Sequence, residues 1–378
     1  MKYLSIFALA AIGLAACSPQ KTTETAEKKD GLIQVPMPMA ENYVDFDTLY
    51  TVEKVFVPEV TEKSAIKNAN RAFWVDSTLV IYDKGNQQVL AFDGNGKFLN
   101  AIGQQGTGEA EFREVSDIVV SQEMVYIFDK TVPKMLVYGL DGHFYRSVPS
   151  KFNFHSFTKA DNGFWLFACQ KSNNPEGFAL IHADETLQDT IAGFFPRHPD
   201  FINVEHGTNF VIHSDKSYFF WPTSNEIYLL QGDSIKWYAT VDFGKNTPNY
   251  AYLSRQSDLR AYESYMEEGK YYRFRNLHIC GDFVTLVYRR YAISDVVQTN
   301  FAFYNRKSGN CTASPLKFAS VNRMLQRSYN IGETDDCMIL DANISHDAAA
   351  KKFVLENYGI ELTENSNTLF ILCRPMLK

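Results

Sequence analysis

The sequence lacks several features that would each assign a function class. It has no long hydrophobic run after residue 17, so no later segment is expected to cross a membrane as a helix. It has no C-x-x-C pair, which disfavours a zinc ribbon or a dithiol redox site, and no G-x-S-x-G motif of a hydrolase. Its formal net charge of −7 provides no basic surface, so no nucleic-acid partner is expected.

The first 17 residues have the pattern of a secretory signal. Lys2 precedes an apolar run at residues 4–15 that is too short to span a bilayer stably. The run ends in Leu14-Ala15-Ala16-Cys17, which resembles a bacterial lipobox. This resemblance implies cleavage before Cys17 and lipid attachment to its sulfur, with an ordinary cleaved signal as the alternative. We therefore expect a lipid-anchored protein of the cell envelope, at the outer membrane, on either its periplasmic or its outer face.

The remaining chain divides by composition into a linker and one domain. Residues 18–41 begin with a polar, charged stretch without large apolar side chains, which predicts a flexible tether. Residues 42–378 are predicted to form a single domain, since the sequence is 45% hydrophobic and closed β architectures often reach this length. Five cysteines remain after Cys17, and their disulfide pairing is left open; they are Cys169, Cys280, Cys311, Cys337 and Cys373.

A repeat of 46 residues organises the domain. Residues 79–98 (LVIYDKGNQQVLAFDGNGKF) align without a gap on residues 125–144 (VYIFDKTVPKMLVYGLDGHF). In this alignment Asp83 matches Asp129 and Gly96 matches Gly142. A shift of twice that length places VYIF (125–128) on SYFF (217–220). Short strands and glycine turns at a period in the forties are typical of propeller blades.

The repeat predicts an all-β fold, a six-bladed β-propeller with four-stranded antiparallel blades, with seven blades as the alternative. A strand within residues 42–60 is expected to complete the last blade, because an open ring would leave unpaired strand edges. Two short helical insertions are expected, one at residues 246–272 with Asp258 near its start and one at residues 346–359. The blades are placed near residues 68–103, 115–148, 155–194, 208–243 and 275–316, and from about residue 335 onward.

Four features of the sequence point to one family. They are the lipobox, the paired blades ending in D-G-x-F, the glycine-rich connection at residues 103–117, and the closing stretch ENSNTLFILCRP at residues 364–375. Together they resemble the six-bladed β-propeller lipoproteins of Bacteroidetes, which are relatives of NHL-repeat propellers. In that family the closing motif usually has a proline where this chain has Thr368. The resemblance implies the fold and carries little functional content.

Two groups of residues are candidate binding sites. Residues just before the innermost strands should converge at one mouth of a central channel, where cationic and imidazole groups would suit an acidic or sugar-like ligand; hydrogen bonding between blades is the alternative. These residues are Arg71, Arg113, His155, His206 and Arg275. A tyrosine-rich insertion could form an aromatic binding surface or only pack its helix onto the propeller. Its candidate residues are Tyr250, Tyr252, Tyr262 and Tyr265.

Metal binding and catalysis have weaker support. His198, His206 and His213 lie close together in the sequence, but their positions in a turn and a strand favour structural roles. We therefore expect no metal, no other cofactor and no assigned catalytic residue. The predicted function is a monomeric binding or scaffold module with a glycan, peptide or envelope-protein partner. The alternative is a propeller hydrolase or lyase with a channel metal, acting on a lactone, glycan or peptide.

Overall fold

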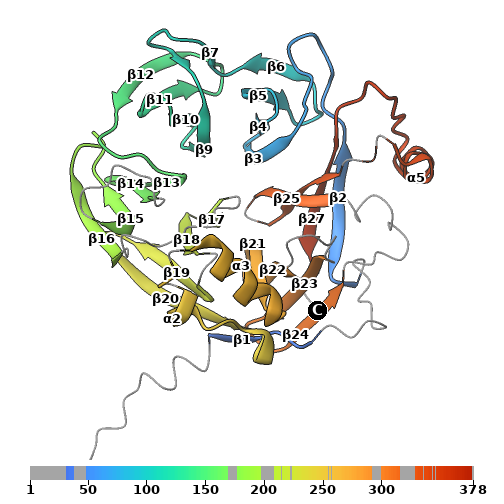
Figure 1. The fold of residues 1–378 in the computed structure, drawn as a ribbon. Helices are drawn as coiled ribbons and strands as arrows, with labels where there is room; N and C mark the ends of the chain where they lie inside the picture. The colour runs from blue at the N-terminus through green and yellow to red at the C-terminus, as the bar shows by residue number, and fades with distance from the viewer. Residues whose placement is uncertain are drawn as a thin grey trace, which may run out of the picture.

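The strands of this chain are arranged as a ring of sheets around a central axis (Figure 1). The structure is a computed structural model that describes residues 31–37, 48–168, 177–196, 208–213, 215–221, 224–253, 255–256, 258–291, 299–315, 328–334, 336–342, 344 and 346–376. The β-rich, propeller-like fold predicted from the repeat is confirmed.

Five four-stranded units are each built from consecutive antiparallel strands, with the innermost strand first in sequence. The first repeat forms β3 (Ala69–Val75), β4 (Thr78–Asp83), β5 (Gln88–Asp93) and β6 (Phe98–Ala101). The second forms β9 (Val115–Ser121), β10 (Met124–Asp129), β11 (Lys134–Gly139) and β12 (Phe144–Pro149). A two-stranded parallel pair, β7 (Gln104–Gln105) with β8 (Glu111–Phe112), connects these two units.

Three further units follow in chain order. The first of them contains β13 (Ser156–Ala160), β14 (Gly163–Phe167), β15 (Phe178–Ala183) and β16 (Thr190–Pro196). The next contains β17 (Phe210–His213), β18 (Lys216–Phe220), β19 (Glu226–Gln231) and β20 (Ser234–Asp242). The last of the three contains β21 (Tyr272–Cys280), β22 (Phe283–Arg290), β23 (Thr299–Asn305) and β24 (Cys311–Pro315).

The closing unit joins the two ends of the chain, as predicted. Strand β2 (Tyr50–Phe56) pairs antiparallel with β27 (Leu369–Pro375), outside β26 (Met338–Ala342) and β25 (Ser328–Glu333). The predicted start of this unit near residue 335 was wrong, because its innermost strand is β25 and the stretch at 338–342 is the second strand. The polar sequence SYNIGE of β25 lacks the apolar run that marks the other strands.

Strand β25 also pairs in parallel with β3, which merges the closing unit and the first unit into one eight-stranded sheet. The contact requires a glycine, because a Cβ on Gly332 would lie 2.0 Å from the carbonyl oxygen of Ala72. Two innermost strands therefore approach each other more closely here than a side chain would permit.

The second strand of each unit is buried on both faces because every sheet packs between two others. In β4, the side chains from Leu79 to Tyr82 are all 0% exposed. Val80 and Tyr82 contact the second repeat, whereas Leu79 and Ile81 contact the closing unit. This two-sided burial explains why the strand sequences are continuous apolar runs and do not alternate with polar residues.

The aspartate repeated at the end of the second strand has a structural role. Asp83 is fully buried and accepts hydrogen bonds from the backbone N–H groups of Lys67, Asn68 and Gly85. Asp129, one repeat later, accepts hydrogen bonds from the backbone N–H groups of Arg113 and three other residues. Each carboxylate thus fixes the connection that leads into its own innermost strand.

The N-terminal segment differs from the predicted linker at residues 18–41. Strand β1 (Leu32–Gln34) pairs in parallel with β20, at the outer edge of its sheet. Ile33 and Val35 are buried there, which explains why these apolar residues are ordered against the sheet. The structure does not describe the chain on either side of this segment.

Both predicted helical insertions are present. Helices α2 (Tyr250–Leu253) and α3 (Leu259–Glu268) follow the short 3-10 helix η2 (Gly244–Asn246), and the Asp258 side chain caps α3 by accepting from the N–H of Arg260. Helix α5 (Ala348–Tyr358) lies between β26 and β27, capped by Asp347 at its start and followed by Gly359 with φ +68°.

The two faces of the ring differ in the length of their connections. On one face, first and second strands are joined by short turns, such as residues 76–77, 122–123 and 161–162. The other face carries the connections between second and third strands and between successive units, including η2, α2, α3 and α5. Function in such folds resides on long connections held by a rigid scaffold, so this second face is the one to search.

Candidate functional site

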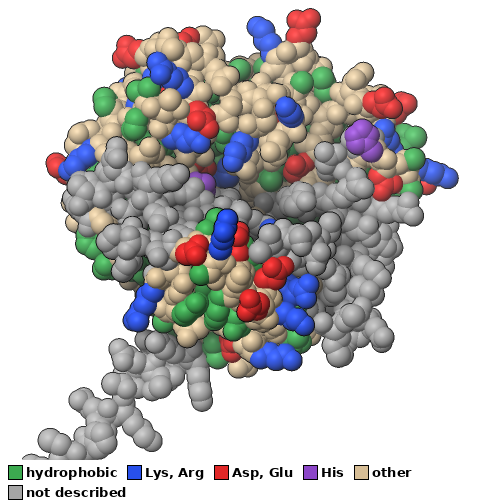
Figure 2. All heavy atoms as spheres, viewed as in Figure 1, with side chains coloured by type: hydrophobic (Ala, Val, Ile, Leu, Met, Phe, Trp, Pro, Cys, Tyr) green, Lys and Arg blue, Asp and Glu red, His purple; other side chains and the backbone are tan. Residues whose placement is uncertain are grey.

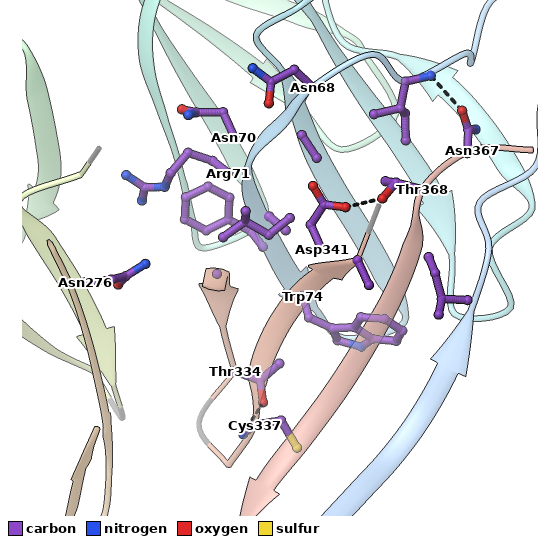
Figure 3. Close-up of a pocket in the computed structure, with 18 of the residues that line it drawn as sticks. Asn68, Asn70, Arg71, Trp74, Asn276, Thr334, Cys337, Asp341, Asn367 and Thr368 are labelled. Atoms are coloured by element: carbon purple, nitrogen blue, oxygen red, sulfur yellow. Dashed lines mark hydrogen bonds between the residues drawn. The ribbon is translucent and has the colours of Figure 1, made fainter. Parts of the chain in front are cut away.

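A cavity of about 910 Å³ lies between the innermost strands and extends toward the junction of the first and closing units. This volume is in the range of small-molecule sites. Its wall combines apolar strand residues with a set of polar side chains from β3, β21, the end of β26 and the approach to β27 (Figure 3). The polar set includes Asn68, Asn70, Arg71, Asn276, Asp341, Asn367 and Thr368.

Arg71 is the buried cation of this wall, to which the exposed Lys67 and Arg374 also contribute, and it is held by a buried ion pair. Its Nη1 donates to Asp117 Oδ1 at 3.1 Å and to Oδ2 at 3.3 Å, and the two side chains are 8% and 6% exposed. The guanidinium also lies over the ring of Phe73, 4.9 Å from its centroid. Burial raises the pKa of Asp117 above its usual value, although Arg71 and the N–H of Phe157 act in the opposite direction.

Asp117 connects three neighbouring innermost strands. It accepts from Arg71 on β3, from the N–H of Ile118 on its own strand β9, and from the N–H of Phe157 on β13. A second contact continues this pattern, because the Ser156 hydroxyl on β13 lies 3.1 Å from Oδ1 of the buried Asn209, just before β17. The cavity wall is therefore rigid and already hydrogen-bonded on this side.

Asp341 and Thr368 form the opposite part of the wall (Figure 3). The Thr368 hydroxyl donates to Asp341 Oδ1, and burial raises the pKa of Asp341 to about 6. Thr368 stands where the resembling family usually has a proline, so this contact depends on the departure from that pattern. A carboxyl group with a raised pKa in a cavity is a feature of functional sites as well as of structural ones.

The side chain of Asn367 forms hydrogen bonds with backbone groups of the segment between β2 and β3. Its Nδ2 donates to the carbonyl oxygens of Pro58, Glu59 and Ser64, and its Oδ1 accepts from the N–H of Ile66. The asparagine of the closing motif thus attaches the link between β2 and β3 to the beginning of β27. Both N–H donors of its amide group are engaged in these contacts and are not left for a ligand.

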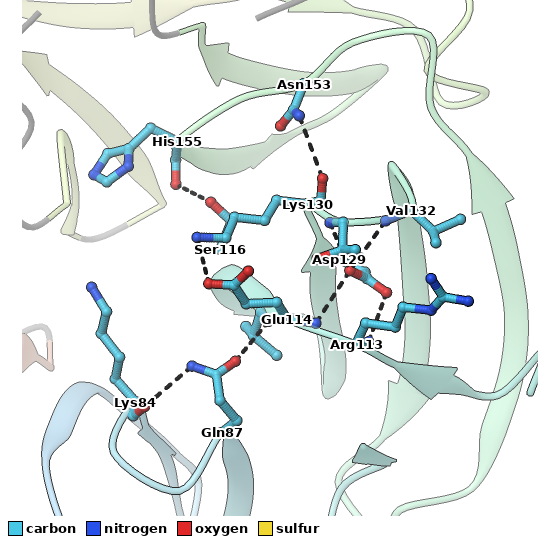
Figure 4. Close-up of polar contacts among 12 residues, drawn as sticks. Lys84, Gln87, Arg113, Glu114, Ser116, Asp129, Lys130, Val132, Asn153 and His155 are labelled. Carbon is cyan, nitrogen blue, oxygen red and sulfur yellow. Dashed lines mark hydrogen bonds and ion pairs between the residues drawn. The ribbon is translucent and has the colours of Figure 1, made fainter. Parts of the chain in front are cut away.

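The predicted channel-mouth residues lie in different places. Arg71 lines the cavity. Arg113 is exposed, and its side chain points away from His155 (Figure 4). His155 accepts a hydrogen bond from the Ser116 hydroxyl through its carbonyl oxygen. His206 and the side chain of Arg275, which lies on β21, are outside the described residues.

A cluster of charges surrounds the same region of the face (Figure 4). Lys130 and Glu114 form an exposed ion pair at 2.7 Å, and Gln87 accepts from the N–H of Val115. Basic and acidic side chains are interspersed over the described part of the face in view (Figure 2). Recognition by a surface field of one sign therefore receives no support, and specific contacts inside the cavity become more important.

Most tyrosines of the predicted aromatic surface are packed against other side chains. Tyr262 is 1% exposed and joins Leu253 and Met266 in a buried cluster, against which Tyr250 and Tyr265 pack. Tyr252 is the exposed member of the four, at 42%. This arrangement corresponds to the alternative in which the rings hold α3 on the sheet.

The described residues contain no group of three or more His, Cys, Asp or Glu side chains placed to hold a metal ion. Of the three histidines considered in the sequence, His198 and His206 lie outside those residues, as does Cys17. His213 is buried at the end of β17, where its Nε2 accepts from the N–H of Gly281 at 3.1 Å. Burial and the nearby His213 lower the pKa of His278 to about 3.

The residues predicted from the sequence to bind a ligand do not include Asp117, Asn68, Asn70, Asn276 or Asp341. A signal for Asp117 was present, since it follows Arg71 by one repeat of 46 residues. No pattern marked the asparagines, because isolated amides in strands do not distinguish a cavity wall from a turn.

None of the helices in the described part of the chain has the length and apolar character needed to cross a bilayer. Within the described part of the chain, Cys280, Cys311, Cys337 and Cys373 are not linked to one another by disulfides, and Cys169 is outside the described residues.

Comparison with known proteins places the fold and the family. A crystal structure of a Bacteroides fragilis protein, named for its expected export, matches with a TM-score of 0.73 and 16% identity, covering 92% of this chain and 100% of that one. A DUF4221 family member from Bacteroides vulgatus matches with a TM-score of 0.53 and 11% identity, covering 87% and 98%. Among curated proteins none matches this sequence. Residues 56–371 match the family model described as a domain of unknown function, DUF4934, and the chain therefore belongs to this family.

Proposed function

We propose that this chain is an exported, lipid-anchored six-bladed β-propeller that binds a small ligand in its central cavity. The observation that carries the proposal is the cavity of about 910 Å³, whose wall presents Arg71, Asp341 and several asparagine amides between otherwise apolar strands. Concave sites of this size with a few convergent polar groups are where proteins bind small ligands.

The blade count is supported by the sheet topology. The first unit, the four units that follow it, and the closing unit each contribute four strands, if the parallel β25–β3 pairing is taken as a contact between two blades. Buried clusters lie between successive units and also between the closing and first units, as expected for a complete ring.

Export and lipid attachment are supported by the lipobox ending in Cys17 and by the name of the Bacteroides fragilis neighbour. The test is metabolic labelling with an alkyne-bearing fatty acid. Wild type should be labelled and membrane-associated, and Cys17→Ser should be unlabelled. Equal labelling of both would contradict the anchor without affecting the cavity proposal.

Ligand binding is tested by thermal shift against a panel of neutral and charged metabolites, using the full chain. Asn70→Trp should fill part of the cavity, and Leu99→Trp, at an exposed site on β6, is the matched control. We expect at least one ligand to raise the melting temperature of wild type and Leu99→Trp but not of Asn70→Trp, since binding to the native state stabilises it. An equal response of all three proteins, or no response of any, would reject the cavity as a ligand site.

A further inference from the structure

The geometry of Arg71 points to a more specific ligand. We propose that the cavity binds a hydroxylated oxyanion, a sugar-like molecule that carries a carboxylate or a phosphate, through the free edge of the Arg71 guanidinium. This inference rests on the proposed function, because it assigns chemistry to the same cavity.

The first step concerns the donors that Arg71 has left. A guanidinium has five N–H donors, and both hydrogen bonds from Arg71 to Asp117 use Nη1. Nε and Nη2 make no hydrogen bond to any residue of the described chain, although the side chain is 92% buried and lines the cavity. These two donors are not among the side-chain nitrogens sealed from solvent, and since Arg71 lines the cavity they are accessible to a ligand there.

The second step concerns the shape of that free edge. Nε and Nη2 form the side of the guanidinium fork that binds a carboxylate or a phosphate with two parallel hydrogen bonds. Asp117 and the ring of Phe73 fix the plane of the group, so the fork is already oriented before a ligand arrives. Figure 3 shows the guanidinium directed away from Asp341, into the space bounded on the other side by Asn276.

The third step concerns the other polar groups of the cavity. Asn68 and Asn70 lie beside Arg71, and the Asp341 carboxyl lies across from them (Figure 3). Amides donate and accept, and a carboxyl group accepts, so this set is suited to hydroxyl groups. A ligand with an oxyanion at one end and hydroxyls along its length would engage both parts of the wall.

The experiment uses three probes that share one sugar ring: glucuronate, glucose 6-phosphate and glucose. Binding to the full chain is measured by calorimetry. We expect one or both charged probes to bind at least ten-fold more tightly than glucose; the tighter of the two identifies the carboxylate or the phosphate. Equal binding of all three probes, or binding of none, would overturn the inference. In either case a neutral metabolite found by the thermal-shift panel would leave the proposed function standing.

Two variants test the role of the fork. Arg71→Lys keeps a cation for Asp117 but lacks the planar fork, and it should abolish the preference for the charged probe. Arg146→Lys, an exposed position on the outer strand β12, is the matched control and should bind as wild type does. An unchanged preference in Arg71→Lys would contradict the proposal.

A measurement on wild type protects the test if Arg71→Lys does not fold. The Nε–H resonance of Arg71 should shift when the tighter charged probe is added, and should stay in place with glucose. Asn70→Ala removes an amide from the same wall without breaking the Arg71–Asp117 ion pair, and it should lower the affinity for the charged probe several-fold. An unmoved Arg71 resonance at saturation would reject the assignment.

Discussion

Arg71 and Asp117 occupy the same position in successive repeats, 46 residues apart, and their side chains form a buried ion pair at 3.1 Å. Equivalent positions of the first two units therefore carry side chains of opposite charge. Because the pair bridges the first and second units, it fixes their relative position at the cavity wall.

The first prediction concerns this pair. Arg71→Ala should lower the free energy of unfolding by about 3–5 kcal/mol, because it leaves Asp117 buried without its cation. The double variant Arg71→Met/Asp117→Asn should lose less free energy of unfolding than the single variants Arg71→Met and Asp117→Asn lose in sum. Denaturant titration measures both. Lys130→Ala, which breaks the exposed pair with Glu114, is the control and should cost less than about 1 kcal/mol. Additive costs in the double variant would contradict the buried coupling.

The second prediction concerns Asn367. Asn367→Ala removes the Nδ2 group that donates to three carbonyl oxygens and the acceptor of the Ile66 N–H, and should lower the free energy of unfolding by about 3 kcal/mol. Asn365→Ala, two residues earlier and exposed, should change stability by less than about 0.5 kcal/mol. Thermal unfolding followed by circular dichroism compares them, and similar melting temperatures for both variants would show that the attachment is unimportant.

The third prediction concerns Asp341. Its pKa is raised from the ordinary value to about 6, so the folded state binds more protons than the unfolded state between about pH 4 and 6. Ionisation of Asp341 therefore lowers the free energy of unfolding as the pH rises from about 4 through 6. Asp341→Asn should be more stable than wild type by about 3 kcal/mol at pH 8, and the difference should disappear near pH 4. A difference that is independent of pH would contradict the raised pKa.

The fourth prediction concerns His278. Its pKa is lowered from 6.5 to about 3, so the unfolded state binds more protons below pH 6.5 and stability falls as the pH decreases. At pH 5 wild type should have lost about 2 kcal/mol through this group. His278→Gln should show a shallower loss in urea titrations between pH 7 and 5, whereas the exposed His143→Gln should follow wild type. Parallel curves for His278→Gln and wild type would rule out this residue as the cause.

The parts of the fold that the sequence predicts well are those with strong local chemistry. The turns at Gly96 and Gly142 with φ near +80° and the Asp258 cap act within a few residues of themselves. The repeated Asp83 and Asp129 hold backbone N–H groups 15 and 16 residues earlier, within one repeat. The pairing of β2 with β27 was predictable for a different reason, since a ring of sheets has to be closed.

The parts that the sequence did not predict depend on contacts between distant segments. Strand β25 carries few apolar residues, and its place is fixed by its parallel pairing with β3 at Gly332. Strand β1 is three residues long and has no pattern of its own. The cavity wall combines residues from units that are far apart in sequence, so no local motif marks it.

The pairing of β2 with β27 also determines when folding can finish. More than 300 residues separate the two strands, and a ribosome adding roughly 5–20 residues per second needs at least about 15 s to produce them. During that time the edge of β2 has no partner and is a template for intermolecular pairing. Completion of the ring has to wait for the C-terminus, which favours a chain that is kept unfolded until its synthesis is complete.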